Sequence, residues 1–77
     1  PNPFTSSVSI SLPESMGENF QIEIIDMNGR TIKSVEKTTK NNSIKLSNLD
    51  ELDSAIYFMK IMDVDAGTSV TKKLIKN

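Results

Sequence analysis

Few side chains in this sequence are suited to covalent or metal chemistry. The chain of 77 residues contains no Cys and no His, which excludes disulfides and the usual zinc and thiol-redox sites. Ser and Thr are frequent, but none has an obvious activating partner, so Ser/Lys pairs are the only nucleophilic chemistry left open. We therefore expect a domain that is not an enzyme and that binds no cofactor.

One acidic segment has the spacing of a metal site. Asp63–Gly67 (DVDAG) resembles the start of a calcium-binding loop. The third acidic ligand of such a loop is missing, and Leu74 stands where a bidentate Glu is required. We therefore interpret this segment as a hairpin turn and expect no metal there.

The charge balance narrows the range of partners. Nine Lys and Arg residues are matched by ten Asp and Glu residues, whereas domains that bind nucleic acid usually carry a basic surplus. No apolar run approaches the roughly 20 residues that span a bilayer. We expect neither nucleic-acid binding nor direct membrane insertion.

The sequence pattern predicts that short β-strands position the side chains of this chain. Apolar and polar side chains alternate with a period of two, which is the pattern of half-buried strands. Turn signals separate the alternating runs at about the spacing expected of an all-β sandwich. We predict six strands, over residues 7–12, 20–26, 31–37, 43–47, 55–64 and 68–76. The predicted fold class is all-β, a small antiparallel β-sandwich.

The first hairpin carries a strong turn signal. Asn28-Gly29 predicts a two-residue hairpin with a type I′ turn, which needs positive φ at both central positions. Ile32 in the returning strand is expected to point inward. Because Val35 is out of phase with Ile32, we also expect a β-bulge or a short strand here.

Two later segments are expected to build the core. Residues 48–54 are interpreted as a connection that crosses from one sheet to the other and places Leu49 and Leu52 on the core. The following run is apolar on both faces, with Ile56 and Phe58 on one of them, which favours a central strand.

The chain opens on PNPFTSS, without an initiator Met. Pro1 and Pro3 stiffen this segment and push the preceding residue toward extended geometry. Phe4 is expected to pin the first strand onto the core. We interpret residues 1–77 as a single terminal domain cut from a longer chain.

Four motifs in a fixed order resemble one protein family. They are PNPF (residues 1–4), DMNGR (26–30), IYFMKI (56–61) and TKKLIK (71–76). With these spacings and this length, the set is similar to the C-terminal sorting domain of the type IX secretion system, in its type A form. The likeness covers essentially all 77 residues. It implies an immunoglobulin-like antiparallel β-sandwich of about six to seven strands, in agreement with the alternation.

The resemblance implies a role in protein transport. Domains of this family end the cargo proteins of certain Gram-negative bacteria, and the cargo crosses the inner membrane with an ordinary signal peptide. The type IX outer-membrane translocon then recognises the folded domain, and a sortase-like cysteine peptidase often removes it. For this chain the resemblance implies an upstream cargo domain that reaches the cell surface or the medium by way of the periplasm.

The family motifs fall on particular positions of this sequence. They match Pro1, Asn2, Pro3, Phe4, Gly29, Arg30, Ile56 and Tyr57. Ala55 stands where the family usually has Gly, which would strain Ala55 if that Gly serves a positive φ. We expect Arg30 to have a structural role, as the partner of Asp26 or of the acidic residues at positions 50, 51 and 53.

The basic end of the chain is the expected recognition element. The residues that match the family's terminal strand are Lys72, Lys73, Leu74, Ile75 and Lys76. An exposed terminal strand offers backbone donors and acceptors for strand addition, and its alternate side chains supply specificity. The lysines have a second interpretation, as charges that prevent aggregation between sheet edges. The family likeness favours recognition by the translocon, and both interpretations can hold together.

Two further hypotheses stay open. The chain is alternatively an accessory immunoglobulin-like or fibronectin-like domain of a surface enzyme or adhesin, which binds carbohydrate or acts as a spacer. One Tyr, three Phe and no Trp supply few aromatic platforms for carbohydrate. Separately, Asp53-Ser54-Ala55 looks like an acceptor for periplasmic O-glycosylation. An intact mass of natively produced protein without added sugar on Ser54 would end that hypothesis.

Overall fold

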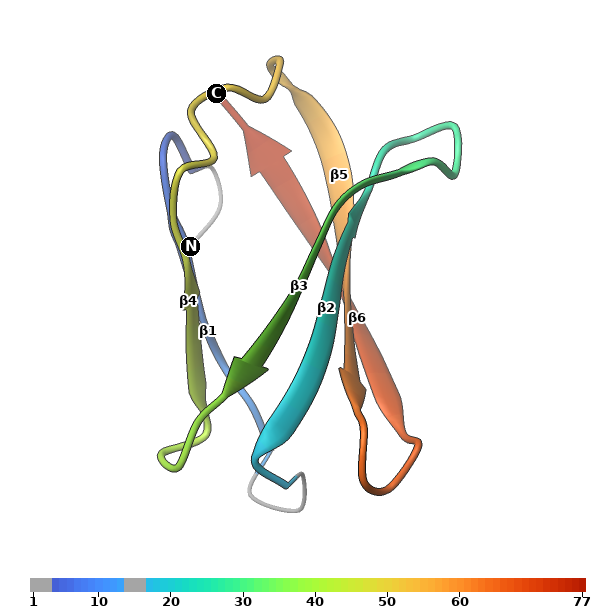
Figure 1. The fold of residues 1–77 in the computed structure, drawn as a ribbon. Coiled ribbons are helices and arrows are strands. Elements are labelled where there is room, and N and C mark those ends of the chain that lie inside the picture. The colour runs from blue at the N-terminus through green and yellow to red at the C-terminus, as the bar shows by residue number, and fades with distance from the viewer. Residues whose placement is uncertain (1–3, 14–16) are drawn as a thin grey trace.

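The computed structural model of the chain describes residues 4–13 and 17–77, so the motif residues Pro1, Asn2 and Pro3 lie outside the described residues. The described residues form six strands and no helix (Figure 1). The strands are β1 (Val8–Ser11), β2 (Asn19–Ile25), β3 (Thr31–Thr38), β4 (Ser43–Leu46), β5 (Ala55–Asp63) and β6 (Ser69–Lys76). Within this part of the chain, nothing helical is long and apolar enough to cross a membrane.

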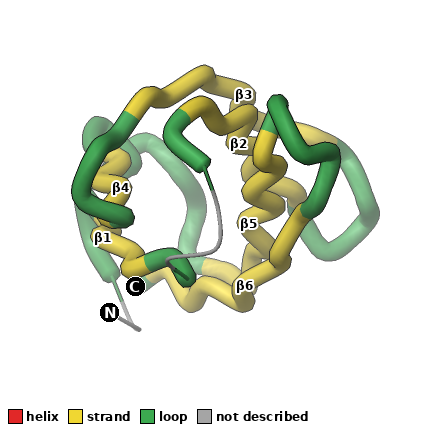
Figure 2. The backbone as a smooth tube through the Cα atoms, turned by 90° about the horizontal axis from the view of Figure 1, so that it is seen from below, coloured by secondary structure: helices red, strands yellow, loops and turns green. Residues whose placement is uncertain are grey.

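The strands form two antiparallel sheets. One sheet pairs β1 with β4, and the other has the order β3-β2-β5-β6. Viewed along the strands, the two sheets enclose a common interior (Figure 2). The predicted all-β fold is confirmed, and every predicted strand end lies within one residue of the observed one. The prediction of β5 as a central strand is also confirmed, because β5 pairs with β2 and β6.

The core lies between the two sheets and follows the predicted alternation. Its buried apolar residues are Phe4, Val8, Leu12, Phe20, Ile22, Ile24, Ile44, Leu46, Leu49, Tyr57, Met59, Ile61 and Leu74. Burial of one large apolar side chain is worth about 1.5–3 kcal/mol. With no disulfide available, this set of contacts is the main term that holds the sandwich together.

The connection after β4 crosses between the sheets as predicted. It leaves the two-stranded sheet and enters β5 of the four-stranded sheet. Leu49 is buried, and Leu52 packs against the core from a partly exposed position. The Leu52 N–H donates to the Leu49 carbonyl oxygen at 3.1 Å, which forms a turn within the connection.

The first hairpin differs from the predicted type I′ turn. Gly29 has a φ of 85°, whereas Asn28 is not in the left-handed region. The Asp26 N–H donates to the Arg30 carbonyl oxygen at 2.9 Å, and the Gly29 N–H donates to the Asp26 carbonyl oxygen at 3.0 Å. The turn is therefore a three-residue loop that ends on a left-handed glycine.

The bulge after this turn is present, but Ile32 does not point inward. Ile24 pairs with Lys33 and Ile25 pairs with Thr31, so Ile32 is the extra residue of the bulge. The prediction for Ile32 was wrong, because a bulge residue lies outside the alternation; its side chain is 40% exposed.

The start of β5 carries a feature of immunoglobulin-like sandwiches. The Tyr57 hydroxyl donates to the Asp53 carbonyl oxygen at 2.7 Å, four residues upstream. A buried Tyr that bonds back to the backbone before its own strand is known as a tyrosine corner. Ala55, just before it, is not among the described non-glycine residues with positive φ, which are Asn42 and Asn48. The strain considered for Ala55 is therefore not present.

Candidate recognition site

The predicted recognition residues, Lys72 to Lys76, all lie on β6. This strand is an edge of the four-stranded sheet and pairs with β5 on one side. Because successive side chains of a strand point to opposite faces, the five residues cannot share one surface.

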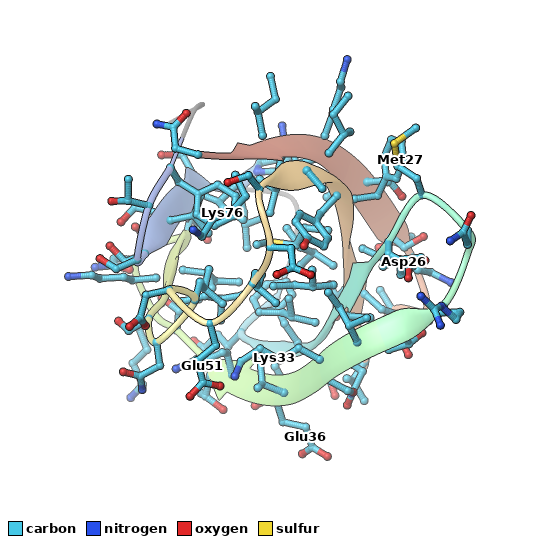
Figure 3. All side chains as sticks on the ribbon, turned by 90° about the horizontal axis from the view of Figure 1, so that it is seen from above. Asp26, Met27, Lys33, Glu36, Glu51 and Lys76 are labelled. Atoms are coloured by element: carbon cyan, nitrogen blue, oxygen red, sulfur yellow. The ribbon has the colours of Figure 1, made fainter. Side chains whose placement is uncertain are left out.

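Two of the predicted residues are buried. Leu74 is a core residue opposite Tyr57 of β5. Lys76 is 9% exposed, and its Nζ donates to the Asn77 backbone oxygen at 2.9 Å. Figure 3 shows Lys76 directed into the end of the sandwich. These two residues hold β6 in place, whereas Lys72, Lys73 and Ile75 are exposed to solvent.

The first and last motifs meet in space. The Phe4 N–H donates to the Ile75 carbonyl oxygen at 2.9 Å, and the Asn77 N–H donates to the Phe4 carbonyl oxygen at 3.0 Å. This forms a short parallel bridge between Phe4 and Lys76, and the Phe4 side chain is buried in the core. We call this contact the terminal clasp. It covers the edge of β6 at its C-terminal end.

Beside the clasp, an open groove of about 240 Å³ separates β6 from the two-stranded sheet. Its walls are Val8–Ser11 of β1 and Lys72–Leu74 of β6. The groove therefore brings the first strand next to the predicted recognition residues, a juxtaposition that sequence alternation does not reveal.

The motif turn Asp26–Arg30 is held by one carboxylate. Asp26 Oδ1 accepts hydrogen bonds from the N–H groups of Asn28 and Arg30, each at 2.9 Å. Asp26 Oδ2 lies 3.0 Å from Arg30 Nε. The Arg30 N–H contributes most to holding the pKa of Asp26 below its usual value, and its guanidinium adds to this effect. The predicted structural pairing of Arg30 with Asp26 is confirmed.

The motif pair Ile56-Tyr57 is split between two faces. Tyr57 points into the core, where burial raises the pKa of its hydroxyl above the ordinary value and the charges of Asp53 and Asp26 add to the shift. Ile56 lies on the outer face of the four-stranded sheet, opposite Ile75 of β6. The two residues therefore have different roles despite being neighbours.

Asp63 has a structural role that the sequence analysis, which named it only as the first residue of the calcium-like segment, did not predict. It is buried, and its carboxylate accepts the N–H groups of Gly17 at 2.8 Å, Asp65 at 3.1 Å and Ala66 at 3.2 Å. These bonds, that of Gly17 first, hold the pKa of Asp63 below its usual value. The segment Asp63–Gly67 forms the predicted hairpin. An Asp at the first position of a turn was the available signal.

Across residues 4–13 and 17–77, no group of three or more Asp, Glu, His or Cys side chains is placed to hold a metal ion. What the described residues offer a partner is a set of surfaces: the exposed side chains of β6, the groove beside it, and the outer face of the four-stranded sheet.

Comparison with known proteins gives one match. The family described as the secretion system C-terminal sorting domain matches residues 1–77. No curated protein and no solved structure matches the chain.

Proposed function

The chain belongs to the family of secretion system C-terminal sorting domains, and from this premise we propose that β6 is the element that the secretion machinery reads. A domain of this family is a C-terminal sorting signal for type IX secretion. It implies a secreted or cell-surface cargo protein and an interaction with the type IX system. Such domains are in general not catalytic.

We further propose which proteins of the type IX system act on the domain. The type IX outer-membrane translocon recognises the folded domain, which consists of residues 1–77 and lies at the C-terminal end of a cargo protein. The cargo protein has by then passed through the periplasm. A sortase-like cysteine peptidase then acts at the cargo side of the domain. The domain itself acts as a signal and has no catalytic role.

The observation that carries the proposal is that β6 has both buried and exposed side chains. Leu74 and Lys76 are buried and fix the strand, while Lys72, Lys73 and Ile75 stay accessible. A receptor that must accept unrelated cargo needs a rigid feature of the domain itself, and an edge strand with exposed side chains is such a feature. The terminal clasp covers the backbone edge at Ile75–Asn77, so contact there depends on side chains.

A secretion assay tests the proposal. Residues 1–77 are fused to the C-terminus of a periplasm-targeted fluorescent protein in a bacterium with a working type IX system. We expect the full fusion at the surface or in the medium. We expect a fusion that lacks Thr71–Asn77, and one with Lys72→Gln and Lys73→Gln, to accumulate in the periplasm.

The lysine pair is the sharper variant, because it leaves Leu74 in the core. Its matched control is Lys37→Gln with Lys40→Gln, two exposed lysines outside β6. If the β6 pair is secreted as well as the control pair, the lysines of β6 are not read. If the full fusion stays in the periplasm although circular dichroism shows it folded, the domain does not act as a signal in that host.

A further inference from the structure

Apolar side chains gather at one end of the outer face of the four-stranded sheet. Ile25 of β2 lies opposite Phe58 of β5, and Ile56 of β5 lies opposite Ile75 of β6. Strand alternation turns all four away from the core, and all four are at least partly exposed. The exposure reaches 40% for Ile75. We call these four residues the outer apolar patch.

The hairpin after β2 extends this patch. Met27 is 66% exposed and Ile32 is 40% exposed. Ile32 follows Thr31, the partner of Ile25 in the register. Figure 3 shows Met27 on the hairpin, pointing away from the interior of the sandwich. Residues from three separate parts of the sequence thus meet at one end of the molecule.

The same face is polar in its middle. Glu23 lies opposite Lys60, which in turn lies opposite Thr71. Polar side chains favour solvent exposure of the middle of this face, but the patch has no such side chains to account for its exposure. A contiguous group of exposed apolar side chains on a small domain usually marks an interaction surface.

The border of the patch is basic. Lys73 lies opposite Phe58 in the register, and Arg30 ends the adjoining hairpin with its charge partly compensated by Asp26. In a symmetric pair of copies, the patch would meet itself and its basic border would meet a basic border. Such like-charge contacts are unfavourable, whereas an acidic border on a different protein is complementary.

We propose that the outer apolar patch docks onto a protein of the secretion machinery that presents an apolar surface with an acidic rim. The inference rests on the proposed function and adds a second contact to β6. Ile75 and Lys73 belong to both surfaces, so a receptor that reads β6 also reaches Phe58 and Ile56. Met27 at the hairpin marks the far limit of the contact.

The secretion assay tests the patch with a matched pair of double variants. Ile25→Thr with Phe58→Thr removes two apolar side chains from the patch, leaves β6 unchanged and keeps residues that favour strands. Met62→Thr with Val64→Thr removes two apolar side chains near the opposite end of β5, where Val64 is 56% exposed. We expect the patch variant to lower surface reporter about tenfold or more, as loss of central interface residues does. We expect the control to stay within about twofold of wild type, as substitutions outside such a centre do.

A photocrosslinking amino acid identifies the occupant. We expect crosslinks from position 27 to one protein of the machinery, and none to that protein from position 64. Should Phe58→Thr abolish cooperative unfolding, Met27→Glu and Ile75→Glu replace it, because both positions are exposed and the new charge opposes an acidic rim.

The outcomes separate this inference from the proposed function. Wild-type secretion by a folded patch variant, while the fusion without Thr71–Asn77 is retained, overturns the docking surface and leaves the role of β6 intact. A dimer in analytical ultracentrifugation that the patch variant abolishes also overturns it, since the patch then binds a second copy. Periplasmic retention of the folded wild-type fusion overturns both.

Discussion

Gly29 is the residue at which backbone conformation alone can be tested. It has a φ of 85°, and no heavy atom lies within 4 Å of the place where a Cβ would stand. Gly29→Ala therefore adds left-handed strain without a clash, and we expect it to lower the free energy of unfolding by about 1–2 kcal/mol. Urea denaturation of both proteins measures the difference. Gly29→Asn should lose less, because Asn tolerates this conformation; equal losses for the two variants would contradict the explanation.

Tyr57 offers a second test at the scale of one residue. Tyr57→Phe removes the hydroxyl that donates to the Asp53 carbonyl oxygen, and we expect a loss of about 1 kcal/mol in the free energy of unfolding. Because the pKa of Tyr57 is raised in the folded state, its contribution is complete below pH of about 10 and declines as the pH rises through the folded pKa. Absorbance titration should show the phenolate forming above its ordinary midpoint. An ordinary midpoint in the folded protein would argue against a buried hydroxyl.

Between elements, Asp63 joins the loop before β2 to the β5–β6 hairpin through its bond with Gly17. Its pKa is lowered in the folded state, so its contribution is present above the unfolded pKa of about 3.9 and is lost as the pH falls through the folded value. We expect stability to decline below about pH 5 and Asp63→Asn to flatten that decline. Thermal unfolding at several pH values measures both.

Asp65 provides the control, since it lies in the same hairpin with an exposed side chain. At neutral pH, Asp65→Asn should stay within about 0.5 kcal/mol of the wild type in the free energy of unfolding. An acid dependence that Asp63→Asn leaves unchanged would contradict the role given to Asp63.

Strand β6 carries both core residues and exposed residues. Leu74→Ala removes a core side chain and should cost about 2–5 kcal/mol, whereas Lys72→Ala changes an exposed position and should stay within about 0.5 kcal/mol. Urea denaturation compares the two. Secretion should fail for Leu74→Ala because the domain unfolds, and for lysine variants although the domain is folded. A folded, stable Leu74→Ala protein would mean that β6 is not anchored through the core.

Alternation predicted β2 well because this strand has one buried face, formed by Phe20, Ile22 and Ile24. Strand β3 has no fully buried side chain, and there the inward residue was predicted wrongly. The turn between β2 and β3 was predicted less well. Asn28-Gly29 favours a type I′ turn by local preference, but the Asp26 carboxylate accepts two backbone N–H groups and stabilises a three-residue loop. The resulting bulge then places Ile32 outside the alternation, and a periodic sequence pattern does not predict the position of such a bulge.

At the scale of the whole molecule, the sequence identified the motif segments but not their arrangement in space. PNPF and TKKLIK were both assigned to the family motifs, yet their contact through Phe4 and Ile75 joins residues from opposite ends of the chain. The outer apolar patch likewise depends on the register of three strands. Pairing between distant segments is set by the packing of the whole sandwich, so local patterns do not contain it.

The last prediction concerns the stability that the terminal clasp provides. Phe4 is 3% exposed, and Phe4→Ala should lower the free energy of unfolding by about 3–5 kcal/mol. A domain of this size has a total of about 5–15 kcal/mol, so the variant should be unfolded to a measurable extent near room temperature. Urea denaturation gives the loss, with Phe58→Ala on the outer face as the matched control.

We expect Phe4→Ala to lower the free energy of unfolding much more than Phe58→Ala does. This order follows from the small core, in which one anchored aromatic is a large fraction of the buried apolar surface. Because the Phe4 backbone also bonds to Ile75 and Asn77, loss of the anchor should speed amide exchange at Asn77 more than at Leu12. The Leu12 N–H donates instead to the carbonyl oxygen of Asn42, just before β4. Equal acceleration at both amides would show that the clasp has no stability of its own. A selective effect at Asn77 would mean that Phe4 holds the C-terminal end of β6 in place.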